Sequence, residues 1–184
     1  MDSRSLEEIK KLRKKYDINQ KELASRAGVS QSLIAKIEAG TVEPTYSKAQ
    51  RIFQALEELR EKQEPKAKEI MKTKIIFAHP KELVKEIIRQ MKTKGISQMP
   101  VQDKGVILGI ITEGLILKHI ADYPEKLSHL SAEDVMGETP PIVSPNTGLK
   151  LLLELLKDYT IVLVAEKGHI QGIISKADVL GRIE

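Results

Sequence analysis

This sequence of 184 residues contains no cysteine and no tryptophan. Without cysteine the chain can form no disulfide, no thiolate metal site and no cysteine nucleophile. Aromatic residues make up only 3% of the chain, which predicts an aliphatic core and argues against a stacking platform for single-stranded nucleic acid. No apolar run approaches the ~20 residues that span a bilayer, and the first residues form no apolar signal region. We therefore expect a soluble, cytoplasmic protein without membrane contact.

The composition is that of a folded chain with unevenly distributed charge. Apolar residues make up 41% and charged residues 30%, and the length allows one domain or two small ones. Most of the net charge of +4 falls in residues 1–63, and a small basic domain suits a polyanionic partner. The charged stretch 61–66, which contains Pro65 and no large apolar residue, indicates a domain boundary.

The N-terminal region has the pattern of short, capped helices. Asn19 with Glu22 three residues later predicts a capping box, and Gly28 predicts the left-handed end of that helix. Ser30 is placed to cap a third helix. Apolar residues at helical spacing predict a longer amphipathic helix over residues 45–62. These signals predict an all-α domain.

The remainder of the chain contains an internal repeat. Residues 67–71 match 132–136, and Gly-Ile-Ile-Thr at 109–112 matches Gly-Ile-Ile-Ser at 172–175. Each unit is expected to run strand, helix, strand, turn, strand and helix, and the first unit is expected to begin with a strand over Ile75–Ala78. A unit of ~50 residues buries too little apolar surface alone, so we expect the two units to pack as a pseudo-twofold pair.

The segment from Gln20 to Gly40 resembles the helix-turn-helix of Cro and phage-repressor (XRE-like) proteins, and the resemblance extends over about residues 6–62. It is carried by a small residue for close helix approach, a glycine turn and three apolar anchors: Ala24, Gly28, Val29, Ile34 and Ile37. In that family the third helix enters the major groove of double-stranded DNA. The resemblance implies four DNA-binding residues, which are Gln20, Gln31, Ser32 and Lys36.

These four residues have different expected roles. Gln20 begins the second helix, where its amide and the helix N-terminus would meet a phosphate. Gln31 can bind adenine through two hydrogen bonds, and Lys36 can reach a guanine or a phosphate. Two alternatives remain open. One is that these residues are ordinary polar surface groups, and the other is that the domain binds a protein rather than DNA.

Residues 67–184 resemble a tandem pair of CBS domains, which are named after cystathionine β-synthase. The resemblance is carried by paired motifs, which are Ile70-Met71, Val135-Met136, Met99-Pro100-Val101, Gly109–Thr112 and Gly172–Asp178. It implies two βαββα units that bind adenine nucleotides or adenosyl compounds in the clefts between them. Such pairs act as sensors attached to another domain, and they commonly associate face to face.

The family motif that holds such a ligand is complete in only one unit. Ser175 and Asp178 match a hydroxyl that meets phosphate and a carboxylate that accepts hydrogen bonds from ribose. In the other unit Thr112 matches, but Leu115 replaces the carboxylate and cannot accept a hydrogen bond. The resemblance therefore places the ligand among His79, Ile96, Ser97, Thr160, Ile161, Ile173, Ser175 and Asp178. The alternative for Asp178 is a carboxylate that stabilises a helix N-terminus and needs no ligand.

These observations predict an α + α/β architecture, with an all-α helix-turn-helix domain at 1–63 and CBS units at 67–122 and 133–184. The expected function is that of an archaeal-type helix-turn-helix and CBS transcription regulator, which dimerises through its CBS pair and senses AMP, ATP or S-adenosylmethionine. Two alternatives are a nucleotide sensor that regulates a partner protein, and a constitutive DNA-binding dimer with a ligand-free CBS scaffold. We expect no enzymatic activity and no required cofactor, because the sequence contains no Gly-x-Ser-x-Gly elbow, P-loop or dinucleotide-binding fingerprint. We expect no metal site, because the four histidines lie far apart in sequence.

Overall fold

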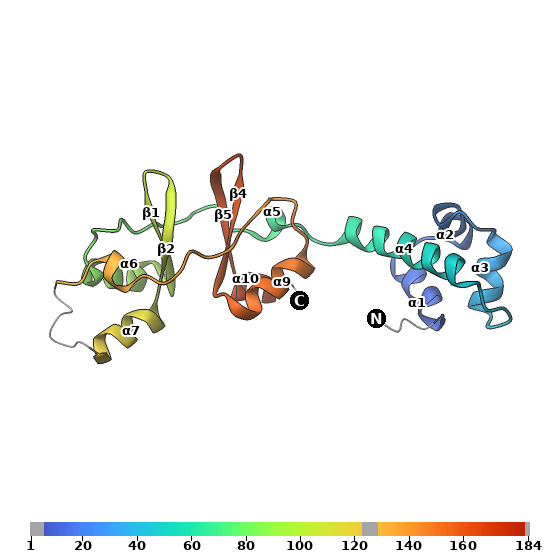
Figure 1. The fold of residues 1–184 in the computed structure, drawn as a ribbon, viewed down its shortest axis with the longest axis horizontal. Helices are drawn as coiled ribbons and strands as arrows, with labels where there is room; N and C mark the ends of the chain where they lie inside the picture. Colours follow the sequence, from blue (N-terminus) through green and yellow to red (C-terminus); the bar gives the residue numbers. More distant parts are fainter. Residues whose placement is uncertain (1–5, 123–128, 183–184) are drawn as a thin grey trace. The chain divides into compact units, whose positions relative to one another are not determined.

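The computed structural model describes residues 6–122 and 129–182. The chain divides into two compact units, Met1–Glu64 and Pro65–Glu184, and each is described by itself (Figure 1). The first unit is helical over its described residues. Its elements are α1 (Glu7–Lys15), α2 (Gln20–Ala27), α3 (Gln31–Glu38) and α4 (Tyr46–Gln63).

The helix boundaries of the first unit follow from local capping. Asn19 accepts a hydrogen bond from the backbone N–H of Glu22, whose carboxylate accepts one from the backbone of Asn19 in return, both at 2.9 Å. Ser30 accepts from the backbone of Leu33 at the start of α3. Gly28 ends α2 with φ of 61°, a left-handed conformation that favours glycine. The capping box, the glycine end and the serine cap predicted from the sequence are thus confirmed.

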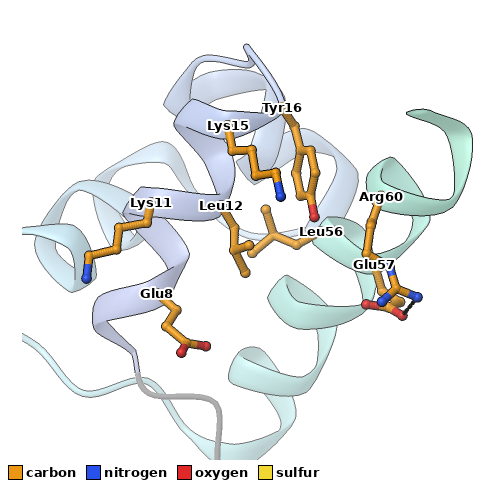
Figure 2. A pocket seen from close by; sticks show the side chains of 8 residues that line it. All are labelled: Glu8, Lys11, Leu12, Lys15, Tyr16, Leu56, Glu57 and Arg60. Atoms are coloured by element: carbon orange, nitrogen blue, oxygen red, sulfur yellow. Dashed lines mark ion pairs between the residues drawn. The ribbon is translucent and has the colours of Figure 1, made fainter. Parts of the chain in front are cut away.

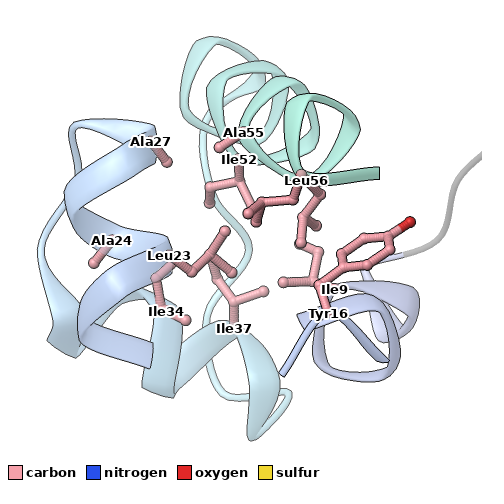
Figure 3. Packing of buried hydrophobic residues seen from close by; sticks show 11 residues of the cluster. Ile9, Tyr16, Leu23, Ala24, Ala27, Ile34, Ile37, Ile52, Ala55 and Leu56 are labelled. Carbon is pink, nitrogen blue, oxygen red and sulfur yellow. The ribbon is translucent and has the colours of Figure 1, made fainter. Parts of the chain in front are cut away.

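One aliphatic core holds the helical unit together. Leu23 of α2 and Ile34 and Ile37 of α3 point toward Ile52 and Leu56 of α4 (Figure 3). Ala24 and Ala27 are small and almost fully buried, which lets α2 pack closely against its neighbours. This core fixes the orientation of α3 and leaves the opposite side of that helix exposed.

The second unit contains two hairpins with the same geometry. The elements of its first half are α5 (Ala67–Ile70), α6 (Val84–Lys94), β1 (Gln98–Asp103), β2 (Val106–Thr112) and α7 (Glu113–Asp122). Those of its second half are α8 (Ala132–Val135), β3 (Ile142–Val143), α9 (Leu149–Asp158), β4 (Ile161–Glu166), β5 (His169–Ser175) and α10 (Lys176–Leu180). β1 pairs antiparallel with β2 and β4 antiparallel with β5, and the register places Val101 opposite Gly109 and Val164 opposite Gly172.

The strand expected over Ile75–Ala78 was wrong, because only Ala78 forms a bridge there, parallel to Val101. The reason is Pro100. The next bond of such a ladder would run from the backbone N–H of residue 100 to the carbonyl of Ile76, and proline has no N–H. In the second half Leu163 occupies the corresponding position and donates to the carbonyl of Pro141 at 2.9 Å, and β3 forms beside it.

The two halves exchange their leading helices. α5, which begins the first repeat in sequence, contributes Ala67 and Ile70 to the core built by α9, β4 and β5. α8, which begins the second repeat, contributes Ala132 and Val135 to the core of α6, β1 and β2. Backbone hydrogen bonds fix both crossings, from Ala67 to the carbonyl of residue 147 and from Ala132 to that of residue 82, each 2.8 Å long. The sequence repeats are therefore not the packing units.

The two motif glycines lie where the exchanged segments cross the hairpins. A Cβ atom added to Gly109 would lie 2.3 Å from the carbonyl oxygen of Gly137. A Cβ added to Gly172 would lie 2.4 Å from Sδ of Met71. These glycines are required by the close approach of the segments that follow α8 and α5, so in this chain their presence needs no ligand to explain it.

Candidate functional site

Three of the four candidate DNA-binding side chains lie on the outer face of α3. Gln31, Ser32 and Lys36 are all exposed, whereas Ile34 and Ile37 of the same helix are buried. Ser30 caps the helix at its start. The helical period therefore separates a core face from a polar face that a nucleic acid could contact.

A basic hollow borders this polar face and includes residues that were not among those predicted from the sequence to bind DNA. It has a volume of about 540 Å³ and is lined by Ser32 and Lys36 of α3 and by Lys48 and Arg51 of α4, among others. The guanidinium of Arg51 donates to the carbonyl of Gly28 at 3.2 Å, which holds it beside the turn between α2 and α3. The signal in the sequence is the spacing of Lys48 and Arg51, which lie three residues apart on the amphipathic helix predicted over residues 45–62. This spacing places both cations on the same face of that helix.

Gln20 lies in a hydrogen-bond network inside the helical unit. Its amide nitrogen donates to Oε2 of Glu38 at 3.1 Å, so one of its two N–H donors is committed and one remains for a phosphate. Arg13 of α1 donates to both oxygens of the same carboxylate, from Nε at 2.6 Å and from Nη2 at 2.9 Å. Glu38 therefore ties the end of α3 to α1 and to the start of α2.

This carboxylate is buried, since only 3% of the Glu38 side chain is exposed and 12% of Arg13. Burial raises the pKa of Glu38, but the hydrogen bonds from Arg13 and Gln20 favour the ionised form more strongly, and the pKa lies below its usual value. The same ion pair raises the pKa of Arg13, against the opposing effect of burial. Both groups are charged at neutral pH.

Another hollow, of about 390 Å³, lies between α1 and α4 (Figure 2). Leu12 and Leu56 line it together with charged residues of both signs, and Arg60 pairs with Glu57 at 2.5 Å on its rim. No candidate DNA-binding residue lines this hollow, so it is a surface separate from the face of α3.

The second unit contains a cleft of about 240 Å³ formed by both of its halves. It contains five of the eight side chains expected to bind the ligand, namely Ile96, Ser97, Ile173, Ser175 and Asp178. The remaining lining residues are Lys72, Lys74, Ile75, Ile76, Gly95, Gln98, Pro100 and Ala177. Apolar walls with a few polar groups at one end are typical of a small-molecule site.

Asp178 lies at the polar end of the cleft and is held from two sides. Its Oδ2 accepts hydrogen bonds from the backbone N–H of Ser175 at 2.8 Å and from the hydroxyl of Ser175 at 2.6 Å. Its Oδ1 pairs with Nζ of Lys72 at 2.7 Å. Burial raises the pKa of Asp178, but Lys72 and Ser175 outweigh burial, so the pKa lies below its usual value and the group is ionised at neutral pH.

Three expected ligand residues do not line this cleft. His79 is exposed, with Nε2 lying 3.6 Å from Asp103 and Nδ1 accepting a hydrogen bond from the backbone of Lys81. Thr160 is exposed and comes directly before β4. Ile161 is fully buried among other core residues. In the repeat, Thr160 and Ile161 of the second half correspond to Ser97 and Gln98 of the first half. They therefore stand at the position that is equivalent to these cleft residues, and not in the cleft itself.

The counterpart of the Asp178 position is apolar. Thr112 accepts a hydrogen bond from the backbone N–H of Leu115 at 3.2 Å, as a simple cap. Leu115 packs toward Gly137, where a Cβ added to the glycine would lie 3.1 Å from Cδ1 of the leucine. The difference between the two units that the sequence indicated is therefore a difference in charge at the same place in the fold.

Within residues 6–122 and 129–182, no cluster of three or more histidine, aspartate or glutamate side chains has an arrangement suited to a metal ion. No helix within these ranges combines the length and the hydropathy needed to cross a bilayer.

Comparison with protein families gives matches over both units. A helix-turn-helix model, HTH_3, matches residues 9–62, and the CBS domain model matches residues 67–122 and 132–184. Neither model describes a catalytic domain. Among curated proteins, a methylated protein of Methanocaldococcus jannaschii is 29% identical over 142 residues, which cover 70% of this chain and 79% of that protein.

A zinc metalloprotease of the same organism is 31% identical over 118 residues, but the match spans only 31% of that protein and 62% of this chain. Among solved structures, a CBS-domain protein of Agrobacterium tumefaciens has a TM-score of 0.61 at 23% identity, covering 65% of this chain and 93% of that one. An uncharacterized conserved protein of Pyrococcus horikoshii has a TM-score of 0.59 at 23% identity, covering 66% and 93%. These structural matches establish the fold of the second unit.

Proposed function

Because this chain belongs to the CBS-domain family and carries a helix-turn-helix domain ahead of its CBS pair, we propose that it is a transcription regulator whose DNA binding responds to an adenosine-type ligand. The first domain is of a DNA-binding type and the second of a ligand-sensing type. The observation that carries the proposal is the exposed polar face of α3, bordered by the cations Lys36, Lys48 and Arg51. An α-helix with such a face fits the major groove, and flanking cations contact phosphates.

Replacement of Gln31 and of Lys48 should have different effects on DNA binding. Gln31→Ala should relax selectivity at one base position and cost about 1–3 kcal/mol on the preferred site, because a bidentate base contact is lost. Lys48→Ala should weaken binding to all sequences alike and reduce the slope of log affinity against log salt by about 1. Fluorescence anisotropy with a selected site and its single-base variants, at several salt concentrations, measures both effects.

The matched control is Gln54→Ala, which removes an exposed glutamine of α4 that does not line the basic hollow. Its affinity and selectivity should equal those of the parent. If Gln31→Ala binds every site variant as the parent does, Gln31 reads no base. If the parent binds no DNA, the first domain serves as a protein-docking surface. The function is then better explained as that of a nucleotide sensor that regulates a partner protein.

For the second domain, we propose that the cleft around Ser175 and Asp178 holds an adenosine-type ligand. Asp178 would accept hydrogen bonds from the two ribose hydroxyls, and the adenine would lie against the apolar residues Ile96 and Ile173. Five cleft residues of the expected types support this assignment, together with the burial of the carboxylate, whose side chain is only 8% exposed. The proposed ligand set is AMP, ATP or S-adenosylmethionine.

Asp178→Ala should weaken ligand binding by about 10- to 100-fold, because a hydrogen bond to a charged group contributes about 1.5–3 kcal/mol. The control is Asp134→Ala. Asp134 caps α8 through Ser131 with the same two distances, 2.8 and 2.6 Å, but lies outside the cleft. Both variants lose a cap, and Asp178→Ala also loses the ion pair with Lys72, so its stability should fall at least as far as that of Asp134→Ala. Calorimetry should show an affinity loss for Asp178→Ala alone. Equal affinities in the two variants would assign Asp178 a capping role only.

We also propose that the chain is a homodimer through its CBS pair, which would place two DNA-reading domains on half-sites about one helical turn apart. Exposed leucines on the helices of both halves support an apolar contact surface, namely Leu117, Leu151 and Leu180. A ligand can change DNA affinity only by as much as its affinities for the two arrangements of the dimer differ. DNA affinity that does not change with AMP, ATP or S-adenosylmethionine would favour the constitutive dimer.

A further inference from the structure

The cleft around Asp178 contains an excess of positive charge. Its charged lining residues are Lys72, Lys74 and Asp178. Neither lysine was expected at the site from the sequence, because both precede the first repeat's hairpin and the motif belongs to the second repeat. The exchange of α5 across the unit brings them there. A cleft with two ammonium groups and one carboxylate suits an occupant that is itself an anion.

Lys72 is anchored at its backbone and exposed at its side chain. Its backbone N–H donates to the carbonyl of Ile173 at 2.9 Å, and its carbonyl accepts from the N–H of Ile173 at 3.0 Å. The strand residue Ile173 lies two positions before Ser175, so the Cα of Lys72 is fixed at the edge of the cleft. Its side chain is 71% exposed and pairs with Asp178. The ammonium can therefore change partners while the backbone stays in place.

The fold does not require the ion pair. The repeat places Gly137 where the other half has Lys72, and Leu115 where it has Asp178. Gly137 keeps the same reciprocal backbone bridge, with hydrogen bonds of 2.8 and 3.3 Å to Ile110. The crossing thus forms around an apolar Gly137–Leu115 contact in one half and around an ion pair in the other. If the ion pair served only to stabilise the fold, both crossings would be expected to have one. Instead, it occurs at the crossing beside the cleft in which the ligand motif is complete.

We propose that Lys72 covers the Asp178 carboxylate until a ligand binds, and then moves to the phosphate of a nucleotide, so that the cleft selects adenosine phosphates over adenosine and S-adenosylmethionine. This inference rests on the proposed function, because it takes the ribose contact of Asp178 as given. Oδ2 of Asp178 already accepts two hydrogen bonds from Ser175, so two ribose hydroxyls compete with the ammonium of Lys72 for the acceptor positions of Oδ1. A phosphate on C5′ offers that ammonium a new anionic partner, and Lys74 provides a second ammonium for the same phosphate.

Ligands without the phosphate lose this compensation. Adenosine takes the carboxylate and leaves Lys72 without an anionic partner in the cleft. S-adenosylmethionine carries a positively charged sulfonium on C5′, where AMP carries its phosphate, and like charges near two lysines are unfavourable. The group attached to C5′ is therefore anionic in AMP, neutral in adenosine and cationic in S-adenosylmethionine, and the lysines read that difference.

The test compares AMP, adenosine and S-adenosylmethionine by calorimetry on the full chain and two variants. Lys72→Gln should weaken AMP binding by about 10- to 100-fold, the loss expected for a hydrogen bond between charged groups. The same variant should bind adenosine as well as or better than the parent, because the competitor for Asp178 is gone. Lys81→Gln is the control, since Lys81 is 72% exposed, forms an ion pair with Glu133 and lies outside the cleft. Its affinities should match the parent's.

The outcomes separate this inference from the proposed function. If the parent binds AMP and Lys72→Gln leaves that affinity unchanged, or weakens AMP and adenosine equally, the role of Lys72 is overturned while ligand sensing stands. If the parent binds S-adenosylmethionine more tightly than AMP, the charge selection is overturned and sensing again stands. If none of the three ligands binds the parent, the proposed ligand function and this inference fall together. Thermal unfolding of each variant verifies that the exposed substitutions leave the fold intact.

Discussion

Glu38→Ala should lower the free energy of unfolding of the helical domain by about 1–3 kcal/mol, the cost of leaving a largely buried polar group without its partner. The carboxylate is 3% exposed and satisfies Arg13 through two hydrogen bonds and Gln20 through a third. Its loss leaves the guanidinium of Arg13 buried without its carboxylate partner. Because Glu38 ends α3, DNA affinity should fall together with stability. Urea denaturation followed by circular dichroism measures the change.

Two further variants test the cause. Glu58→Ala removes an exposed carboxylate of α4 and should change stability by no more than about 0.5 kcal/mol. The double variant Arg13→Met with Glu38→Leu removes both charges and should recover much of the loss, since a buried pair replaced by apolar groups is often neutral. A double variant as unstable as Glu38→Ala would show that the packing of these side chains matters and their charge does not.

The same ion pair gives the helical domain a defined pH dependence. The pKa of Glu38 is lower in the folded chain than its usual value, so the unfolded chain binds a proton at higher pH than the folded chain. The stability from this group is therefore fully present above the usual pKa of glutamic acid. It is lost as the pH falls through the lowered pKa of the folded state, and Glu38→Ala should remove that acid-dependent part.

Gly109→Ala should destabilise the CBS pair by about 1–3 kcal/mol through overpacking, with about 1 kcal/mol more for each hydrogen bond that breaks. The added Cβ would lie 2.3 Å from the carbonyl oxygen of Gly137, and a backbone atom cannot rotate away as a side chain can. Relief requires the crossing segment to move, which strains the two hydrogen bonds between Ile110 and Gly137. Thermal unfolding of the full chain, compared with that of the parent, reports the loss.

Gly114→Ala is the control for this prediction. Gly114 lies in the first turn of α7, and the nearest atom to an added Cβ is the hydroxyl oxygen of Thr112 at 3.8 Å. Alanine is the better helix former, so this variant should stabilise the domain by up to about 1 kcal/mol. Opposite signs for the two alanine substitutions support the close crossing as the cause. A neutral Gly109→Ala would mean that the crossing segment adjusts freely.

The helix-turn-helix could be predicted because its signals are local. The caps at Asn19 and Ser30 and the left-handed Gly28 each involve groups within a few residues of one another, so the sequence alone specifies them. The same holds for Ser175 and Asp178, which are three residues apart at the start of one helix. The role of Glu38 was not predictable in this way, because Arg13 and Gln20 reach it from two other helices.

The sequence by itself determined the two domain types, the repeat and the difference between Asp178 and Leu115. Only the tertiary structure decided which residues share a cleft. Each half binds the leading helix of the other, so Lys72 lies beside Asp178, whereas Thr160 and Ile161 do not line that cleft although they belong to the same repeat as Asp178. The missing strand over residues 75–78 has a similar cause, since it depends on Pro100 in a different segment. Repeats in sequence reveal which segments are equivalent, but the path of the chain between them decides which segments touch, and that path depends on long-range packing.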